Sequence, residues 1–448
     1  MTSLLAVGAC RGGAVDAELR ELDGRTVACF RLAGGKHHGA VGQVEGEMLE
    51  RLIDAAVEGG VPVLGVIDSS GADATEGVTA LHAWGRVAAS LARASGMVPV
   101  VLVVVGPCVS GPALLLGLAD VVVMTEDAFA YVSGPGSVRQ AIGIDVTHAK
   151  LGGAGMHALT SGVATLVAPD EDEAVLLARD VLVHLPANNC AEAPDLGTDD
   201  PVDRDCAVAA RAVPPDPSSS YDVRTVVTDV VDDGSLFELW PRWAGSIVTA
   251  LATIEGRAVG VVANQPQHLA GTLTIESSQK GARFVQLCDA FNIPLVTFVD
   301  TPGFQPGKDI EWQGMIRHGA QLVHAYAEAT VPRVCVVLRK AYGGAYIVMD
   351  SRGLGNDACF AWPTAEIAVM GAKGAVQILH RGIDDGARAE LELDYAARYC
   401  TPAVAADRGL VDDVIDPVDT RRVVALALRG LRAKRERLVR RRHSNGPL

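Results

Sequence analysis

Two short glycine-containing segments each follow an apolar, β-branched run, and both are candidates for stabilising negative charge. The first has the sequence VLVVVGPCVSGP and contains Ser110 and Gly111, and the second has the sequence VCVVLRKAYGGAY and contains Gly344 and Ala345. Small residues between a strand and a helix let backbone N–H groups point at an open position, where a helix N-terminus adds further donors. Such a site suits a developing oxyanion, and losing one well-placed donor costs about 2.7–4 kcal/mol in known enzymes. The alternative is that these glycines only permit close packing of a helix against a strand.

Other catalytic signatures are absent from the sequence. It contains no H-E-x-x-H, no G-x-x-x-x-G-K-[ST] and no G-x-S-x-G. His37 and His38 are adjacent and His318 and His324 stand six apart, and neither spacing favours a metal site. Ser110 has no neighbouring base in the sequence, so a serine hydrolase is poorly supported. We therefore expect no bound metal.

The two glycine-containing segments occupy equivalent places in an internal repeat. The sequences DGRTVACF and EGRAVGVV begin at Asp23 and Glu255, a displacement of 232 residues, and the same displacement relates VPVLGVIDSSG to IPLVTFVDTPG. A displacement of 233 residues places Gly111 on Gly344. Because several anchors recur in order at a nearly constant spacing, we interpret the chain as a duplicated module.

Each module predicts strands that alternate with helices. Apolar runs at 63–67, 100–105, 295–299 and 334–338 are bounded by Gly, Pro or Asp and are typical of buried strands. Apolar residues between them recur at helical spacing, and the alternation indicates an α/β fold with largely parallel pairing. The stretch 186–222 contains six prolines and three consecutive serines, a composition typical of an exposed linker. We therefore predict an N-terminal domain over 1–186, a linker over 187–222 and a C-terminal domain over 223–448.

Length and composition exclude several classes of protein. The chain has 448 residues, of which 49% are apolar and 21% charged, so it is not largely disordered. Its net charge of −15 disfavours nucleic-acid binding. The longest apolar run, near 98–105, is too short to span a membrane, and the N-terminus has no basic region of a signal peptide. Nine cysteines without a C-x-x-C pair favour a reducing cytoplasm.

Three long segments of the second half carry a family resemblance. They read FVDTPGFQPGKDIEWQGMIRHGAQLVHAYAEATVPRV from Phe298, RKAYGGAYIVMDSR from Arg339 and AWPTAEIAVMGAKGAV from Ala361. From about Asp23 to its end, the chain resembles the carboxyltransferase (β) subunit of biotin-dependent acyl-CoA carboxylases, closest to members that act on acetyl-CoA and propionyl-CoA. The resemblance implies two tandem crotonase-like domains of the ClpP/crotonase type, each a ββα superhelix, assembled as a trimer of dimers.

The resemblance also implies a division of labour between the two halves. Ser110 and Gly111 would hold the thioester carbonyl of acyl-CoA as it becomes an enolate. Gly343, Gly344 and Ala345 would hold the ureido oxygen of carboxybiotin. Loss of CO2 leaves a basic ureido nitrogen that takes the α-proton, so the cofactor would supply the base that the side chains lack. The active site would form between the first domain of one subunit and the second domain of its dimer mate.

Three further positions are expected to bind the acyl-CoA: Ile347, Gly39 and Gly71. Ile347 matches a position that lines the acyl pocket in the family, and an apolar residue there suits a short alkyl chain better than a charged one. Around the two glycines, this chain has HGAVG and DSSGAD where the family has FGGALG and DSGGAR, so Asp73 replaces a cation. Likewise GPCVSGP stands for GPCAGGA and introduces Pro112, although the two N–H groups before this proline are expected to remain available.

A partner subunit is implied as well. The sequence contains no Met-Lys dipeptide of the kind that carries biotin and no nucleotide-binding loop. We therefore expect a biotinylated α subunit, with biotin carboxylase and biotin carrier, to deliver the cofactor. The arginine-rich segment 421–443 predicts an amphipathic helix with a solvated basic face, and the alternative is a docking surface for an acidic partner or for CoA phosphates.

Two other functions stay open at this point. One is the carboxyltransferase-like subunit of a biotin-dependent decarboxylase that acts with a membrane partner. The other is a degenerate, non-catalytic paralogue that assembles with active subunits, which the altered first-half motifs motivate.

Overall fold

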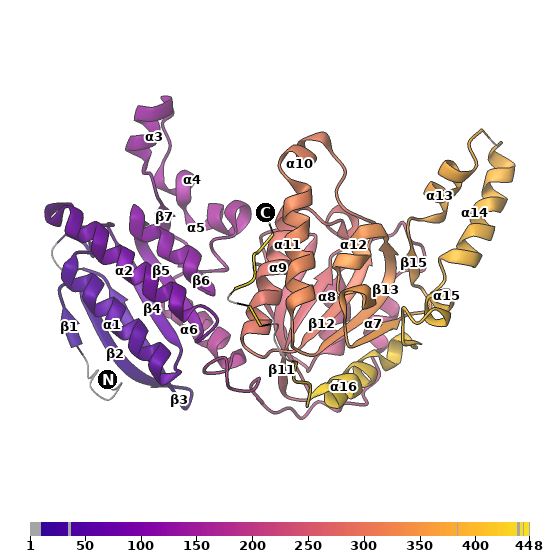
Figure 1. The fold of residues 1–448 in the computed structure, drawn as a ribbon, viewed down its shortest axis with the longest axis horizontal. Helices are drawn as coiled ribbons and strands as arrows, with labels where there is room; N and C mark the ends of the chain where they lie inside the picture. Colours follow the sequence, from indigo (N-terminus) through magenta and orange to yellow (C-terminus); the bar gives the residue numbers. More distant parts are fainter. Residues whose placement is uncertain (1–9, 35–36, 383, 437–439, 442, 448) are drawn as a thin grey trace. The chain divides into compact units, whose positions relative to one another are not determined.

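The structure of the chain is a computed structural model, and it describes residues 10–447 except 35–36, 383, 437–439 and 442. The described residues form two compact units (Figure 1). Unit 1 runs to Pro194 and includes Trp240–Trp243 and Ala290–Asn292, and unit 2 comprises the remaining residues. Each unit is built on one eight-stranded sheet with helices packed against it, so the α/β architecture expected from the sequence is present in both.

In unit 1, the strands lie in the order β1-β2-β3-β4-β5-β6-β8, and β7 pairs with the end of β5. The pairs β1–β2 and β2–β3 are antiparallel, and the other pairs are parallel. The strands are β1 (Cys10–Gly12), β2 (Val15–Leu22), β3 (Arg25–Leu32), β4 (Val63–Ser69), β5 (Val100–Val109), β6 (Val121–Thr125), β7 (Phe129–Tyr131) and β8 (Leu166–Ala168). The helices are α1 (Gln43–Gly59), η2 (Ala74–Glu76), α2 (Val78–Ala94), the 3₁₀-helix η3 (Gly111–Leu118), α3 (Pro135–Ile142), α4 (His148–Gly152), α5 (Ala154–Met156), η4 (His157–Ser161) and α6 (Glu171–His184).

Unit 2 repeats this plan in the order β16-β14-β13-β12-β11-β10-β9, with β15 paired to the end of β13. The strands are β9 (Phe237–Leu239), β10 (Ile247–Ile254), β11 (Arg257–Asn264), β12 (Leu295–Thr301), β13 (Arg333–Tyr342), β14 (Ala358–Ala361), β15 (Glu366–Ala368) and β16 (Asp413–Val414). The helices are α7 (Ala207–Ala212), α8 (Val223–Val230), η5 (Leu269–Gly271), α9 (Ile275–Ala290), α10 (Lys308–Trp312), α11 (Met315–Glu328), α12 (Gly343–Val348), η6 (Arg352–Leu354), α13 (Ala372–Leu379), α14 (Asp385–Tyr399), α15 (Pro402–Asp407), η7 (Pro417–Asp419) and α16 (Thr420–Leu431).

The internal repeat predicted from the sequence is present in the backbone. The bounds of β2, β3 and β4 lie 232 positions before those of β10, β11 and β12, and the bounds of β5 lie 233 positions before those of β13. Left-handed backbone conformations recur at the same displacement. His38 and Gly39 have φ of 52° and 70°, and their counterparts Ala270 and Gly271 have φ of 54° and 76°. The duplication therefore extends from strand bounds to individual turn residues.

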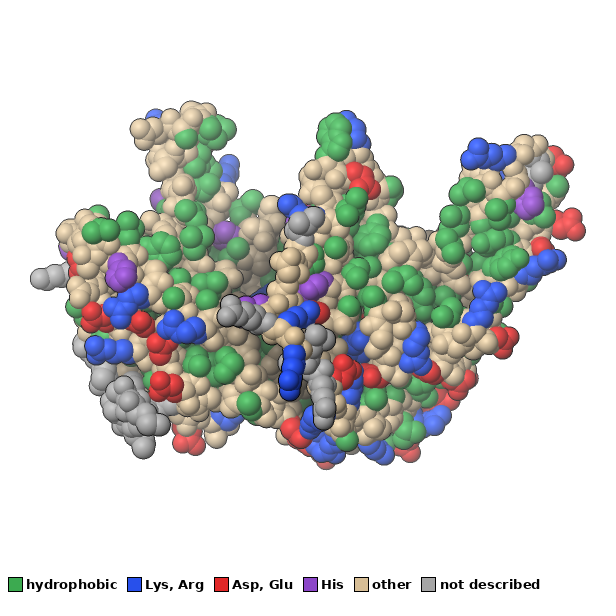
Figure 2. Space-filling view, in the orientation of Figure 1, with side chains coloured by type: hydrophobic (Ala, Val, Ile, Leu, Met, Phe, Trp, Pro, Cys, Tyr) green, Lys and Arg blue, Asp and Glu red, His purple; other side chains and the backbone are tan. Residues whose placement is uncertain are grey.

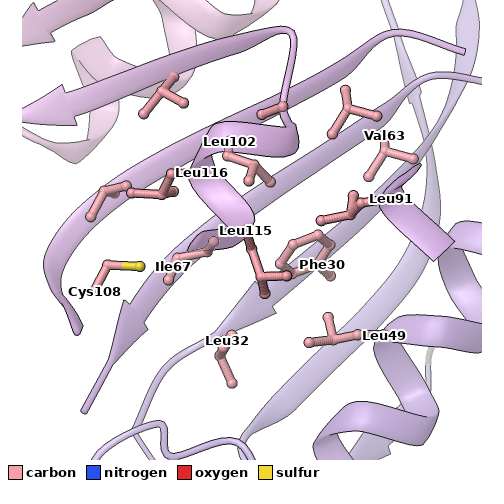
Figure 3. Packing of buried hydrophobic residues seen from close by; sticks show 14 of the residues in the cluster. Phe30, Leu32, Leu49, Val63, Ile67, Leu91, Leu102, Cys108, Leu115 and Leu116 are labelled. Atoms are coloured by element: carbon pink, nitrogen blue, oxygen red, sulfur yellow. The ribbon is translucent and has the colours of Figure 1, made fainter. Parts of the chain in front are cut away.

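The interior of unit 1 explains why its apolar runs form strands. Every residue from 100 to 104 is buried, as expected for a central strand that is covered on both faces. On α1, Leu49 and the other apolar residues at helical spacing are buried as well. Figure 3 shows Leu49 and Leu91 of the helices beside Phe30 and Leu32 of the sheet. Burying one such side chain contributes about 1.5–3 kcal/mol, so this cluster holds the strand ends where the turns begin.

The segment between the two predicted domains is more structured than its composition indicated. The units divide at Pro194 and Asp195, and the residues after this point belong to unit 2. Cys206, Ala209 and Tyr221 are buried in the core of unit 2, where α7 packs against α8. Leu196 and Val208, in contrast, are exposed. The predicted linker over 187–222 therefore includes helix α7 and a few buried residues, while many of its other residues are exposed.

The first part of the arginine-rich segment 421–443 forms α16, which ends at Leu431, and residues 437–439 and 442 lie outside the described residues; the first arginine of the segment is not solvated. Arg421 is fully buried, pairs with Asp232 at 2.7 Å and donates to the carbonyl oxygens of Val230 and Pro201. A buried guanidinium requires such acceptors, so Arg421 serves to attach the last helix and not to dock a partner. No helix among the described residues combines the length and the apolarity that crossing a membrane requires.

Candidate active site

Two strand-to-helix turns hold the residues that the sequence singled out. The first turn (residues 110–112) leads from β5 into η3, and the second turn (residues 343–345) leads from β13 into α12. The first residue of each turn has a positive φ, 66° for Ser110 and 58° for Gly343. Beside each turn, a three-residue strand pairs in parallel with the end of the long strand, β7 with β5 and β15 with β13. The displacement of 233 therefore aligns the two turns residue by residue.

The second turn offers free backbone donors. Gly343, Gly344 and Ala345 are the first three residues of α12, and the first N–H groups of a helix have no intrahelical acceptor. The bridge between Tyr342 and Ala368 uses the Gly343 N–H, as the corresponding bridge in the first turn uses the Ser110 N–H, so Gly344 and Ala345 are the residues whose N–H groups have no intrahelical acceptor. Gly344 is exposed, whereas the methyl group of Ala345 is buried. Because α12 has only six residues, the individual N–H groups and not a long helix dipole would act on a bound oxygen.

The first turn offers fewer donors, and the prediction that the Ser110 N–H is available is wrong. This group donates to the carbonyl oxygen of Tyr131 at 2.9 Å. The cause is β7, because the parallel ladder between β5 and β7 continues by one residue and takes up the Ser110 amide. Pro112, the counterpart of Ala345, has no N–H. Gly111, the first residue of η3, therefore carries the one remaining N–H of this turn, and it has no intrahelical acceptor.

The glycines expected to bind substrate lie beside the first turn. The hydroxyl of Ser69 donates to the carbonyl oxygen of Gly39 at 2.6 Å and accepts from the N–H of Gly71 at 3.2 Å. A Cβ on Gly71 would lie 3.0 Å from the Cβ of Ser110, and a Cβ on Gly39 would lie 2.1 Å from the carbonyl oxygen of Asp68. The structure thus brings Gly39, Gly71 and the first turn together, and close backbone approach requires both residues to be glycine.

The carboxylate that replaces a family cation is already paired. Asp73 lies 2.8 Å from the Nδ1 of His37 and accepts from the N–H and hydroxyl of Thr75. Hydrogen bonds from Thr75 and His37 lower the pKa of Asp73 to about 2. The same loop is attached through Ser70, whose hydroxyl donates to the carbonyl oxygen of His37. Asp73 therefore makes its hydrogen bonds within the loop that borders Gly71. The sequence alone did not indicate this structural role.

Apolar side chains border the second turn, and the sequence indicated only one of them. Ile347 lies on α12 and is 43% exposed. A Cβ on Gly344 would lie 3.6 Å from the ring of Phe304, and a Cβ on Gly343 would lie 3.1 Å from the carbonyl oxygen of Val369. Val369 is itself 75% exposed. Figure 2 shows hydrophobic side chains on this face of unit 2 over α11, α12 and the α13–α14 hairpin.

A buried ion pair fixes the far end of α12. Asp350 follows the helix with a positive φ of 57°, and its carboxylate lies 2.7 Å from the Nη1 of Arg333, the first residue of β13. Asn356 donates to the carbonyl oxygen of Asp350 at 2.6 Å. Burial raises the pKa of Asp350 to about 6, although Arg333 opposes the shift. These contacts hold α12, and with it the donors of the second turn, against the sheet.

Replacing Gly111 with alanine is expected to destabilise unit 1 by about 1–3 kcal/mol. The added Cβ would lie 2.8 Å from the indole ring of Trp84, so the ring or the turn must move. Gly117 is a matched control on the same helix, because a Cβ there meets nothing within 4 Å. Gly117→Ala should be neutral or slightly stabilising. Thermal denaturation compares the two, and equal stability of both variants would show that the contact with Trp84 does not constrain the turn.

The described residues include no group of three or more His, Cys, Asp or Glu side chains arranged to hold a metal ion. Each turn, taken by itself, presents backbone donors and is suited to bind a carbonyl oxygen on which negative charge develops.

Comparisons with known proteins give results that agree with one another. The family described as "Carboxyl transferase domain" matches residues 10–446. A propionyl-CoA carboxylase carboxyltransferase subunit from Haloferax mediterranei is 44% identical over 435 residues, which cover 96% of this chain and 84% of the relative. A methylmalonyl-CoA decarboxylase subunit alpha from Veillonella parvula is 40% identical over 428 residues, which cover 95% of this chain and 84% of the relative. The solved hexamer of transcarboxylase 12S, with methylmalonyl-coenzyme A and methylmalonic acid bound, matches with a TM-score of 0.94 and 42% identity over 97% of this chain and 85% of that chain.

Proposed function

The chain belongs to the carboxyl transferase domain family, as a carboxyltransferase subunit of the acyl-CoA carboxylase type, and from this premise we propose that it moves a carboxyl group from carboxybiotin to the α-carbon of a short acyl-CoA. Its substrate would be propionyl-CoA or acetyl-CoA, giving methylmalonyl-CoA or malonyl-CoA. The observation that carries the proposal is the pair of aligned strand-to-helix turns, each of which opens a helix with a backbone N–H that has no intrahelical acceptor.

The second turn fits the ureido ring of biotin. A ureido oxygen is a neutral acceptor, and the N–H groups of Gly344 and Ala345 are donors at a helix start without intrahelical acceptors. The ring of Phe304 beside Gly344 suits the apolar faces of such a bicyclic group. When bound, biotin carries the carboxyl group and supplies the base that removes the α-proton. The residues of the second turn orient that group and stabilise charge on its carbonyl oxygen.

The first turn would hold the thioester carbonyl oxygen of the acyl-CoA. The N–H of Gly111 is the backbone donor, and Gly39 and Gly71 keep the neighbouring surface free of side chains so that the thioester can approach the backbone. As the α-proton leaves, negative charge moves onto this oxygen, where a donor in a site without water is most effective. Ile347 would contribute an apolar wall for the acyl chain, which favours a short alkyl group over a charged one.

The arrangement of domains and subunits follows the same proposal. Residues 1–186 would form the acyl-CoA side and residues 223–448 the carboxybiotin side, with the active site shared between two subunits of a trimer of dimers. The related transcarboxylase 12S is a hexamer, which supports this assembly. A biotinylated partner with biotin carboxylase and biotin carrier parts would deliver the cofactor.

A second candidate is a decarboxylase subunit that removes the carboxyl group from methylmalonyl-CoA or malonyl-CoA. The 40% identity to the decarboxylase subunit from Veillonella parvula favours it, and the same two turns would serve the reverse reaction. The non-catalytic paralogue is the third, and the bonded Ser110 amide together with Pro112 is the observation in its favour.

One experiment separates the three. The purified chain is incubated with free biotin and methylmalonyl-CoA or malonyl-CoA, and decarboxylation is followed. It is then combined with a biotinylated partner subunit, ATP, bicarbonate and either propionyl-CoA or acetyl-CoA. The proposal expects turnover in both assays. Decarboxylation without ATP-driven carboxylation would favour the decarboxylase, and a folded oligomer without turnover in either assay would favour the non-catalytic paralogue.

A further inference from the structure

The first turn lacks a donor that its counterpart has. In the second turn, both Gly344 and Ala345 carry N–H groups that have no intrahelical acceptor. In the first turn, the aligned positions are Gly111, which has such an N–H, and Pro112, which has none. A site for an oxyanion works best with two converging donors, so one donor must come from elsewhere.

Ser110 is held in a backbone conformation that disfavours any side chain. Its φ of 66° and ψ of −152° fall in a region that is essentially restricted to glycine, and its counterpart is Gly343 with φ of 58°. Such a conformation costs on the order of 1–3 kcal/mol for a residue with a Cβ. Strain of this kind is concentrated at functional sites, which directs attention to what the serine side chain contributes.

The hydroxyl of Ser110 differs from those of the other serines around the first turn. The hydroxyl of Ser69 donates to the carbonyl oxygen of Gly39, and that of Ser70 donates to the carbonyl oxygen of His37. Ser110 is exposed, and the side-chain hydrogen bonds around the turn are made by Ser69 and Ser70 and not by Ser110. Its Cβ lies on the side of Gly71, where a side chain on that glycine would come within 3.0 Å. The absence of a side chain on Gly71 therefore leaves space for the hydroxyl.

We propose that the hydroxyl of Ser110 is the second donor of the first turn and, together with the N–H of Gly111, binds the thioester carbonyl oxygen. The inference rests on the proposed function, because it assigns the acyl-CoA carbonyl to this turn. The hydroxyl donates a hydrogen bond and keeps its proton. His37, His148 and His157 of unit 1 make side-chain hydrogen bonds to other residues, so none of these bases activates Ser110 as a nucleophile.

Three variants test the proposal by turnover. Ser110→Ala removes the hydroxyl, and kcat and kcat/KM should fall together by about 10²-fold, because the lost interaction strengthens in the transition state. Ser110→Gly should lose as much activity while raising the melting temperature, since glycine relieves the strained φ. Adding Pro112→Ala to Ser110→Gly supplies a backbone N–H at the position of Ala345, and activity should recover in part. Ser95→Ala, an exposed serine after α2, is the matched control and should leave activity unchanged. Full activity of Ser110→Gly would overturn the proposal.

A spectroscopic measurement keeps this proposal separate from the proposed function. The stretching frequency of a ¹³C-labelled thioester carbonyl is measured for propionyl-CoA bound to the chain alone, without biotin. Two donors should lower the frequency relative to free propionyl-CoA, and Ser110→Ala should return it part of the way. A shift that depends on Ser110 in a chain without turnover would support the donor and contradict carboxyl transfer. A shift that is the same in Ser110→Ala would overturn the donor whatever the turnover.

Discussion

Replacing Ala345 with proline is expected to reduce carboxyl transfer by about 10²–10³-fold while the chain stays folded. Proline removes one N–H of the second turn, and losing a single donor of an oxyanion site has an effect of this size. The chain itself shows that the position accepts the substitution, because Pro112 stands at the aligned place in the first turn and the following helix η3 still forms. Since the lost donor stabilises charge in the transition state, kcat should fall more than the affinity for substrate changes.

Two neighbouring variants control for the shape of the turn. Ala345→Gly keeps the N–H and removes only a buried methyl group, so activity should remain within a few-fold of the unchanged chain. Gly344→Ala also keeps its N–H, and its Cβ would make an ordinary contact of 3.6 Å with Phe304. Sedimentation velocity verifies that each variant assembles like the parent chain. If Ala345→Pro retained the activity of Ala345→Gly, the amides of the second turn would have no part in the reaction.

The fold could be predicted from the sequence because buried strands and an internal duplication both leave strong patterns in it. The predicted runs at 63–67, 100–105, 295–299 and 334–338 lie inside β4, β5, β12 and β13, and the repeat predicted at 232–233 holds for strand bounds and turn residues alike. The crotonase-like two-domain α/β fold that the resemblance implied is confirmed by the match to transcarboxylase 12S. Central strands buried on both faces are nearly continuous apolar runs, which is why they stood out.

The N–H groups available in the first turn could not be predicted from the sequence in the same way. The fate of the Ser110 amide depends on β7, a strand of three residues that carries little signal and lies twenty residues further along the chain. One clue was present, however. A strict displacement of 233 aligns Gly111 and Pro112 with Gly344 and Ala345, so the missing donor at Pro112 follows from the repeat alone. The resemblance emphasised the neighbouring pair and hid this shift of one residue.

The burial of individual residues was the other feature that composition did not predict. The sequence presents Arg421 as the start of a basic stretch, and only the packing of α16 shows that it is buried against Asp232. The proline- and serine-rich segment 187–222 likewise looked exposed throughout, although Cys206, Ala209 and Tyr221 pack into unit 2. In both cases local composition was outweighed by long-range contacts, which no local pattern records.

A buried ion pair beneath the second turn gives the largest expected effect on stability. Arg339, near the end of β13, lies with its Nε 3.0 Å from the carboxylate of Asp300, and both side chains are almost fully buried. Replacing Arg339 with methionine should lower the free energy of unfolding of unit 2 by about 3–5 kcal/mol, because it leaves a buried carboxylate without its partner. Urea denaturation followed by the fluorescence of the buried Trp362 measures the loss. Arg398→Met is the control, since its ion pair with Asp394 is exposed and should contribute less than about 1 kcal/mol.

A comparison with unit 1 indicates that the stability lost in Arg339→Met can be restored by a second substitution. At the aligned positions unit 1 has Gly106 and Asp68, so the same strand end exists without an arginine, and Asp68 is only partly buried. Burial raises the pKa of Asp300 and Arg339 opposes that shift, so the pKa should rise further once the arginine is gone. A carboxyl group with a raised folded-state pKa favours the folded state at low pH, and this contribution is lost as the pH rises through that pKa. The deficit of Arg339→Met should therefore be smaller at pH 5 than at pH 8. Adding Asp300→Asn should remove both the pH dependence and most of the deficit. If instead the deficit of Arg339→Met were equal at the two pH values, the unpaired carboxylate would not be its cause. The lost contacts of Arg339 with backbone carbonyls would then destabilise the variant.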